Sequence, residues 1–236
     1  AALMVFGLAS CGGGSGKVSD KDITVISREE GSGTRDAFTE LTGVLQDDVD
    51  KTVDTAEISN STSVVTQSVA GNDAAIGYIS LGSLDDTVKA VKVDGVEATD
   101  DNIKSVDYKN QRPFNIVTKG EVKELPAVFI KFILSKDGQK IIEDEGYISV
   151  NDNAESYKAS GLKGSITLAG STSVSPVMEV LADKYKELNS GVTIEIQQTG
   201  SGAGIQSTTE GVCDIGMASR ELKDEETSQG LKSEEI

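Results

Sequence analysis

The chain carries the stretch SREEGSGTR at residues 27–35. An apolar run over residues 23–27 precedes it and predicts a buried strand. Apolar residues at helical spacing over residues 37–45 follow it and predict a helix. Glycine lets backbone N–H groups approach a ligand, hydroxyls donate hydrogen bonds, and arginine offers a bidentate positive charge. Such a set at the start of a helix predicts a cage for a small oxyanion.

Two further turns have a similar glycine-rich and hydroxyl-rich sequence. The segment GSTS at residues 170–173 lies between a predicted strand, residues 165–169, and a predicted helix from Ser175. The segment TGSGAG begins at residue 199, and Ser219-Arg220 follows it after one more strand. A single Gly-Ser-Gly turn is common in purely structural loops, but three of the four arginines lie in these segments. Two cages in one chain predict two lobes that close on one anion, at the carboxyl ends of parallel strands.

The remaining elements follow from apolar periodicity and from glycine or proline boundaries. We expect a hairpin around Asp94-Gly95 and a helix after Gly138. The segments at residues 70–80 and 210–219 are similar, which indicates either two related lobes or two chance helix–glycine–strand units. The other expected elements are helices over residues 61–70, 125–133 and 175–188 and strands over residues 75–79, 112–117 and 192–196.

Composition excludes several classes of function. The formal net charge of −17 argues against nucleic acid and against an anionic membrane surface. The same charge repels an anionic ligand, but salt screens that repulsion over roughly 8 Å. The 236 residues include no histidine, which removes histidine-based triads, bases and metal sites.

The sequence supports an enzymatic function less well than it supports a binding function. The nucleotide-binding P-loop and the Gly-x-Ser-x-Gly elbow of serine hydrolases are absent from the sequence. Ser32 as a nucleophile would need a lysine base, and none lies near it in sequence. The acidic pairs at residues 47–48, 85–86 and 100–101 are interpreted as solvated faces, not metal sites. We therefore expect no catalysis, cofactor or metal, and we keep a surface enzyme acting on phosphate esters through Ser32 as the alternative.

The first 20 residues indicate export. Residues 1–9 are apolar, and the segment LASC at residues 8–11 resembles a bacterial lipobox, in which the cysteine is lipidated. Cys11 is the predicted lipidation site and residues 12–19 a flexible leash; the alternative is a free cysteine in a disordered tail. Cys213 lies in an apolar run and is interpreted as a small buried hydrophobe.

Glu30 places a carboxylate beside the predicted anion cage. This arrangement suits a ligand that still has a proton to donate, as monohydrogen phosphate does at neutral pH. Sulfate has none and would face an unpaired like charge. The hypothesis is that Glu30 accepts the ligand proton; the alternatives are that Glu30 points to solvent or pairs with Arg28 or Arg35.

Together, the segments at residues 27–35, 169–176, 199–202 and 214–222 resemble the phosphate-binding lipoproteins that deliver phosphate to ABC importers. The resemblance covers nearly all of the chain after Cys11. It implies an α/β, two-lobed type II periplasmic-binding-protein fold with a hinge and a phosphate cleft between the lobes. By likeness, the phosphate contacts would be Arg28, Glu30, Ser32, Gly33, Thr34, Thr172, Ser173, Ser201, Ser219 and Arg220, with Glu30 in the proton-accepting position.

Two features depart from the usual pattern of this family. Many members carry an aspartate where this chain has Ser219-Arg220. The usual chain also begins with the Gly-Ser-Thr lobe, which comes last here, so we expect a circular permutation. We further expect a C-terminal truncation that removes a crossing segment of the first lobe.

The resulting assignment is a signal remnant, lipidated cysteine and linker over residues 1–20, an incomplete lobe over 21–110, a second lobe over 111–236 and a hinge near 111–114. The expected function is extracytoplasmic capture of inorganic phosphate by a lipid-anchored protein that hands it to a membrane-embedded ABC permease. The alternative binder takes another oxyanion or a phosphorylated metabolite.

Overall fold

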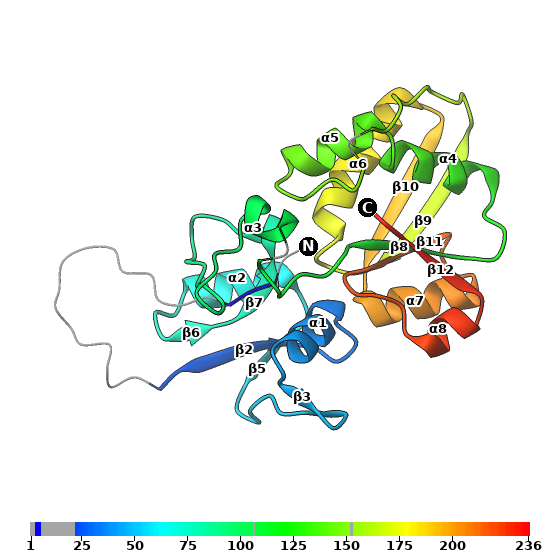
Figure 1. The fold of residues 1–236 in the computed structure, drawn as a ribbon. Helices are drawn as coiled ribbons and strands as arrows, with labels where there is room; N and C mark the ends of the chain where they lie inside the picture. Colours follow the sequence, from blue (N-terminus) through cyan, green and yellow to red (C-terminus); the bar gives the residue numbers. More distant parts are fainter. Residues whose placement is uncertain (1–2, 6–21, 106, 152) are drawn as a thin grey trace. The chain divides into compact units, whose positions relative to one another are not determined.

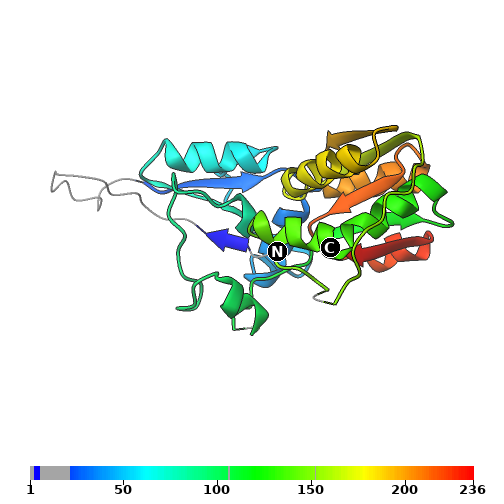
Figure 2. The same ribbon diagram turned by 90° about the horizontal axis from the view of Figure 1, so that it is seen from above.

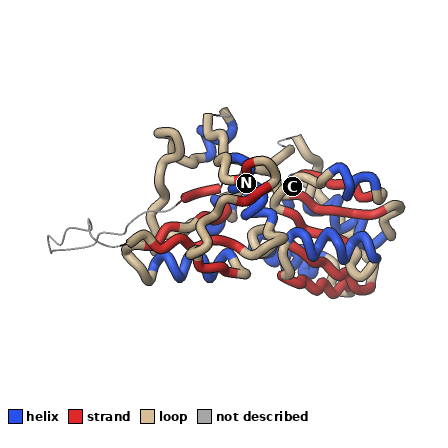
Figure 3. The backbone as a smooth tube through the Cα atoms, turned by 90° about the horizontal axis from the view of Figure 1, so that it is seen from below, coloured by secondary structure: helices blue, strands red, loops and turns tan. Residues whose placement is uncertain are grey.

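The computed structural model describes residues 3–5, 22–105, 107–151 and 153–236. The chain divides into two compact units, Ala1–Arg112 and Pro113–Ile236. Both units combine helices and strands (Figure 3). Within the described residues, no helix is both long enough and apolar enough to cross a membrane.

The first unit is built around a small parallel sheet. Its strand order is β5-β2-β6, with β2 (Thr24–Arg28) between β5 (Glu57–Ser59) and β6 (Ala75–Ile76). Helix α1 (Gly33–Leu41) follows β2, and α2 (Thr62–Ala70) follows β5 and lies along β2 (Figure 2). The core between α2 and the strands consists of Ile26, Val65, Val69, Ala75 and Ile79.

Smaller elements complete this unit (Figure 1). Strand β1 (Leu3–Val5) pairs antiparallel with β7 (Tyr78–Ser80), and a 3-10 turn, η2 (Leu81–Ser83), follows. The hairpin of β3 (Leu45–Gln46) and β4 (Val49–Asp50) turns on two aspartates with positive φ. Helix α3 (Asp100–Lys104) ends the described elements of this unit.

Three sequence predictions in the first unit need correction. The strand predicted over residues 75–79 is interrupted at Gly77, where a Cβ would lie 2.8 Å from Val65 Cγ1, so β6 and β7 pair with different strands. The helical pattern predicted to reach Leu45 ends at Leu41, because Gly43 adopts a φ of 72° and the chain turns into β3. The hairpin predicted around Asp94-Gly95 is reduced to a single bridge between Val93 and Val96.

The second unit has a five-stranded mixed sheet in the order β10-β9-β11-β8-β12 (Figure 1). Strands β9 (Gly164–Gly170), β10 (Val192–Gln198) and β11 (Ile215–Ala218) are parallel, and β8 (Asn115–Lys119) is antiparallel to both β11 and β12 (Leu231–Glu235). The carboxyl ends of the three parallel strands therefore lie at one edge of this sheet.

Helices connect the strands of this sheet. They are α4 (Glu124–Ile133), α5 (Lys136–Asp144), α6 (Ser175–Leu188), α7 (Ser201–Glu210) and α8 (Asp224–Ser228). Helix α7 contacts β9 and β11, and α6 contacts β10. The predicted start of a helix after Gly138 was wrong: α5 begins at Lys136, capped by the Ser135 hydroxyl, which accepts from Gly138 N at 3.3 Å.

Candidate functional site

In the first unit, the turn after β2 opens helix α1. Gly31 has a φ of 81°, and the Ser32 hydroxyl caps the helix by accepting from Arg35 N at 3.4 Å. Gly33 and Thr34 form the first helical positions and are buried, as is Ser32. The first N–H groups of a helix have no partner within it and carry a partial positive charge, so this turn can hold an anion.

Arg28 is the last residue of β2, and only 1% of its surface is exposed. Its Nε and Nη2 donate to the two carboxylate oxygens of Glu29, at 2.8 and 2.9 Å. Its Nη1 donates to Thr62 Oγ1 at 3.1 Å, and Nε also reaches the carbonyl of Ser59 at 3.2 Å. Thr62 is the first residue of α2, so the guanidinium links the ends of β2 and β5 to the start of a second helix.

Arg35 supports the same turn from α1. Its Nε and Nη2 donate to Asp50 Oδ2 at 2.9 and 2.7 Å, and its Nη1 donates to the carbonyl of Arg28 at 2.9 Å. Burial acts to raise the pKa of Asp50, but hydrogen bonds from Thr52 and Arg35 outweigh it and hold that pKa below its usual value. Asp50 is thus ionised at neutral pH and ties the β3–β4 hairpin to this turn.

The carboxylates that pair with these arginines are not the one that sequence reasoning singled out. Glu29 forms the ion pair with Arg28 and Asp50 forms the one with Arg35, whereas Glu30 is exposed. The adjacency of Glu29 to Arg28 was a signal that sequence analysis did not use. No pattern in the sequence points to Asp50. The proton-accepting role of Glu30 stays a prediction.

In the second unit, three serine hydroxyls from three separate segments form one buried cluster. Ser171 Oγ donates to Ser219 Oγ at 3.0 Å, and Ser219 Oγ lies 3.3 Å from Ser201 Oγ. Ser219 N also donates to Ser201 Oγ at 3.1 Å. Ser171 follows β9, Ser219 follows β11 and Ser201 opens α7, so the cluster lies at the carboxyl edge of the parallel strands.

Thr172 and Ser173 occupy the turn between Ser171 and helix α6. Both are buried, and Ser173 N donates to Ser171 Oγ at 3.2 Å. The Ser175 hydroxyl donates back to the Ser171 carbonyl at 2.9 Å, which fixes the first turn of the helix. The structure thus brings Thr172 and Ser173 to the same edge as the serine cluster. Ser171 is not among the predicted contacts, although it lies in the GSTS segment at residues 170–173.

Gly170 lets these segments converge. Gly170 has a φ of 145°, and a Cβ at this position would collide with the backbone of Met217 in β11. The Gly170 carbonyl accepts from Thr199 N at 3.0 Å and from Gly200 N at 2.9 Å. The exits of β9 and β10 are therefore joined directly by backbone hydrogen bonds, without side chains between them.

Arg220 follows the cluster and is buried in a bidentate ion pair. Its Nη1 and Nη2 each donate to one carboxylate oxygen of Glu226 at 2.8 Å. Lys223 N donates to the same carboxylate at 2.8 Å, and Asn115 Nδ2 donates to the Arg220 carbonyl at 3.1 Å. Glu226 lies six residues downstream on α8, a spacing from which sequence reasoning did not infer a pair.

Comparison with known proteins assigns this chain to a family. Residues 15–137 and 155–236 match the family described as the PBP superfamily domain. Phosphate-binding protein PstS 2 of Streptococcus agalactiae is 50% identical over 232 residues, 96% of this chain and 79% of that protein. This chain belongs to the PstS family of the PBP superfamily. The protein of the same name from Streptococcus pneumoniae is 49% identical and covers 94% of this chain and 78% of its own length.

A solved structure supports the same family. The crystal structure of a phosphate ABC transporter, phosphate-binding protein from Streptococcus pneumoniae TIGR4 is 48% identical, with a TM-score of 0.73, over 91% of this chain and 85% of that one. The PstS resemblance and the periplasmic-binding-protein fold predicted from sequence are confirmed. The circular permutation stays a prediction.

The pairing of Arg220 with Glu226 in this PstS chain gives a pH prediction. Burial acts to raise the pKa of Glu226, but hydrogen bonds from Arg220 and Lys223 N outweigh it and hold that pKa below 4.5. A carboxylate with a lowered folded-state pKa stabilises the fold above its unfolded pKa, and this stabilisation is lost as pH falls through the folded value. Glu226→Gln should cost about 2 kcal/mol at pH 7.

Urea denaturation at pH 7, 5, 4 and 3 checks this prediction. The difference between wild type and Glu226→Gln should be constant from pH 7 to 5 and shrink below about pH 4.5. The matched control is Glu225→Gln, because Glu225 is exposed in the same turn of α8. A difference between wild type and Glu226→Gln that persists unchanged at pH 3 would contradict the ion-pair argument.

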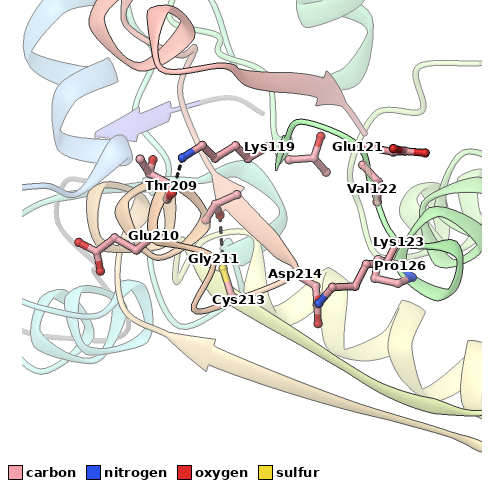
Figure 4. A pocket seen from close by; sticks show the side chains of 12 residues that line it. Lys119, Glu121, Val122, Lys123, Pro126, Thr209, Glu210, Gly211, Cys213 and Asp214 are labelled. Atoms are coloured by element: carbon pink, nitrogen blue, oxygen red, sulfur yellow. Dashed lines mark hydrogen bonds and ion pairs between the residues drawn. The ribbon is translucent and has the colours of Figure 1, made fainter.

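A separate pocket of about 380 Å³ in the second unit lies at the C-terminal end of α7 (Figure 4). Lys123 Nζ pairs with Asp214 Oδ1 at 2.9 Å on one side, and Lys119 Nζ donates to the Thr209 carbonyl at 2.6 Å on the other. None of the residues predicted to contact phosphate lines this pocket.

The structure describes one of the two cysteines. Cys213 is buried, as the sequence predicts, and its sulfur lies 3.3 Å from Thr208 Oγ1. Burial raises the pKa of the Cys213 thiol, which keeps it protonated. Cys11, the predicted lipidation site, lies outside the described residues.

Proposed function

We propose that this chain captures inorganic phosphate outside the cytoplasm and hands it to an ABC permease. The observation that carries the proposal is the buried cluster of Ser171, Ser201 and Ser219 at the start of α7 and near the start of α6. The names of the Streptococcus relatives support the choice of phosphate. The proposed contacts are Arg28, Glu30, Ser32, Gly33, Thr34, Thr172, Ser173, Ser201, Ser219 and Arg220.

The physical argument rests on local donors. Each hydrogen bond to a charged group contributes about 1.5–3 kcal/mol net. Micromolar affinity corresponds to about −8 kcal/mol, so a handful of such bonds suffices after ordering costs. The net charge of −17 opposes the approach of phosphate only weakly at physiological salt, because screening acts over roughly 8 Å. Salt bridges to Glu29 and Glu226 hold the buried Arg28 and Arg220 in place.

The finer parts of the proposal concern anchoring and capture. A lipid on Cys11 would hold the protein at the outer surface of the cell membrane, with residues 12–19 as a leash. A hinge near residues 111–114 would let lobes over residues 21–110 and 111–236 close on one phosphate. The turn before α1 and the serine cluster of the second unit would then bind the same phosphate. We expect no contact with nucleic acid.

A binding role fits Ser32 better than catalysis does. Its hydroxyl accepts the Arg35 N–H at the cap of α1, which is the ordinary use of a serine at this position. The relatives are phosphate-binding proteins by name, and the name of the solved structure also includes a phosphate ABC transporter. A binder of another oxyanion or a phosphorylated metabolite remains the alternative function.

Isothermal titration calorimetry of the 236-residue chain with phosphate and with sulfate tests the proposal. We expect one phosphate per chain with micromolar or tighter affinity, and much weaker sulfate binding. Absence of phosphate binding, or turnover of a chromogenic phosphate ester, would overturn the receptor function. Two phosphates per chain would overturn the idea that both anion sites serve one ligand.

The selectivity hypothesis predicts the behaviour of a single variant. Glu30→Gln should reduce the preference for phosphate over sulfate by at least tenfold, because an amide that can donate replaces a carboxylate that only accepts. The measurement is calorimetry of both anions. Glu29→Gln is the comparison. Glu29 pairs with Arg28, so loss of this carboxylate should lower the affinity for phosphate and for sulfate by the same factor. Unchanged discrimination in Glu30→Gln would reject the hypothesis.

A further inference from the structure

The backbone of Arg28 lies where the sheet of the first unit ends. Strand β2 pairs with β6 only through Thr24 and Val25, because β6 stops at Ile76. A Cβ on Gly77 would lie 2.8 Å from Val65 Cγ1, so the chain at Gly77 passes close to α2 before β7 begins. Arg28 lies three residues beyond Val25, the last position of β2 that pairs with β6, and a buried backbone N–H requires an acceptor.

The side chain of Tyr78 supplies that acceptor. Arg28 N donates to the Tyr78 hydroxyl at 3.1 Å, and the same hydroxyl lies 2.8 Å from Ser27 Oγ in a shared hydrogen bond. Tyr78 is 5% exposed, and its ring stacks on Phe38 of α1 with centroids 4.1 Å apart and planes 9° apart. One side chain thus fixes the end of β2 and the face of the helix that opens the anion site.

The chemistry of this hydroxyl suits a permanent acceptor. Burial raises the pKa of Tyr78, so its hydroxyl stays neutral across physiological pH. On the other side of the peptide chain, the Arg28 carbonyl accepts from Arg35 Nη1 at 2.9 Å. The backbone of Arg28 is therefore held by side chains at both its N–H and its C=O.

We propose that Tyr78 is a positioning residue for phosphate binding, which acts by fixing the backbone from which the Arg28 guanidinium projects. The inference rests on the proposed function, because it assigns Tyr78 an effect on that same site. Tyr78 does not need to touch the ligand. Its hydroxyl sets where Arg28 stands, and a small displacement of a charged donor weakens the bond it makes to an anion.

The test is Tyr78→Phe, which keeps the ring and its stacking on Phe38 and removes only the hydroxyl. We expect phosphate affinity to fall about tenfold in calorimetry, since the buried Arg28 N–H loses its acceptor. Tyr157→Phe is the matched control, because its hydroxyl donates to Asn189 at 3.4 Å in the second unit. This control should bind phosphate as the wild type does.

A double-mutant cycle separates positioning from general destabilisation. In an Arg28→Lys background, Tyr78→Phe should cost less than twofold, because the group that it positions has gone. A structural defect alone would cost the same tenfold in both backgrounds and would overturn the inference. Equal affinity of Tyr78→Phe and wild type would overturn it as well.

A second measurement covers the case in which Tyr78→Phe does not fold. Hydrogen exchange of the wild-type Arg28 amide should be slow, because the Tyr78 hydroxyl protects it. Rapid exchange at that amide would overturn the inference. If the wild type itself binds no phosphate, the proposed function fails and this inference fails with it. If the wild type binds phosphate and Tyr78→Phe binds it with the same affinity, the inference fails and the proposed function stands.

Discussion

Replacing Arg28 with lysine should weaken phosphate binding by about 100-fold. The guanidinium uses its planar fork to reach both oxygens of Glu29 and the hydroxyl of Thr62. A lysine ammonium is a point charge on a flexible stem and cannot hold that set of contacts together. The proposed function gives the guanidinium two charge-assisted bonds to phosphate, and their loss at about 1.5 kcal/mol each corresponds to roughly 100-fold.

Calorimetry with phosphate measures this effect, and urea denaturation shows whether the fold survives. The matched control is Lys184→Arg, because Lys184 pairs with Glu187 at 2.7 Å on an exposed stretch of α6 and lies outside the proposed contacts and hinge. We expect that control to bind as the wild type does. An Arg28→Lys affinity within threefold of the wild type would contradict the assignment of Arg28 to the site.

Replacing Gly204 with alanine should destabilise the second unit by about 2–3 kcal/mol. Helix propensity alone predicts the opposite sign, a gain of roughly 0.5–1 kcal/mol for alanine in a helix interior. A Cβ at Gly204, however, would collide with the backbone of Ala169 and Gly170 in β9. The helix would have to move off the sheet, and Ser201 at its start would leave the serine cluster.

Urea denaturation and phosphate calorimetry of Gly204→Ala test this prediction. Gly211→Ala at the end of the same helix is the comparison, because Gly211 has a φ of 72° and nothing within 4 Å of its added Cβ. That variant should cost roughly 1–2 kcal/mol of conformational strain and leave phosphate binding intact. A Gly204→Ala protein more stable than the wild type would show that α7 is not packed tightly on β9.

The sequence predicted many of the elements whose signal is local. The helices that open at Gly33, Thr62, Ser175 and Ser201 follow a turn rich in serine or glycine. Capping, turn geometry and apolar periodicity involve residues within about four positions of each other, so they can be read along the chain. The burial of Cys213 followed in the same way from its apolar neighbours.

Prediction failed where the deciding contact is distant. The interruption at Gly77 depends on the approach of Val65, and β12 owes its place to pairing with β8. Most residues of strand β12 are exposed and it carries no apolar run. Its sequence therefore has no apolar periodicity that would predict a strand. Helix α5 is a local exception, because the Ser135 hydroxyl caps it three residues ahead of Gly138.

The amino-acid sequence alone determined that this chain has α/β architecture and carries hydroxyl-rich and glycine-rich turns with arginines beside them. Those features rest on backbone freedom and short-range hydrogen bonding. Only the tertiary structure decided which acid holds each arginine: Glu29 for Arg28, Asp50 for Arg35 and Glu226 for Arg220. With 39 acidic residues in the chain, every arginine has many candidate partners, and three-dimensional packing alone brings one of them within reach.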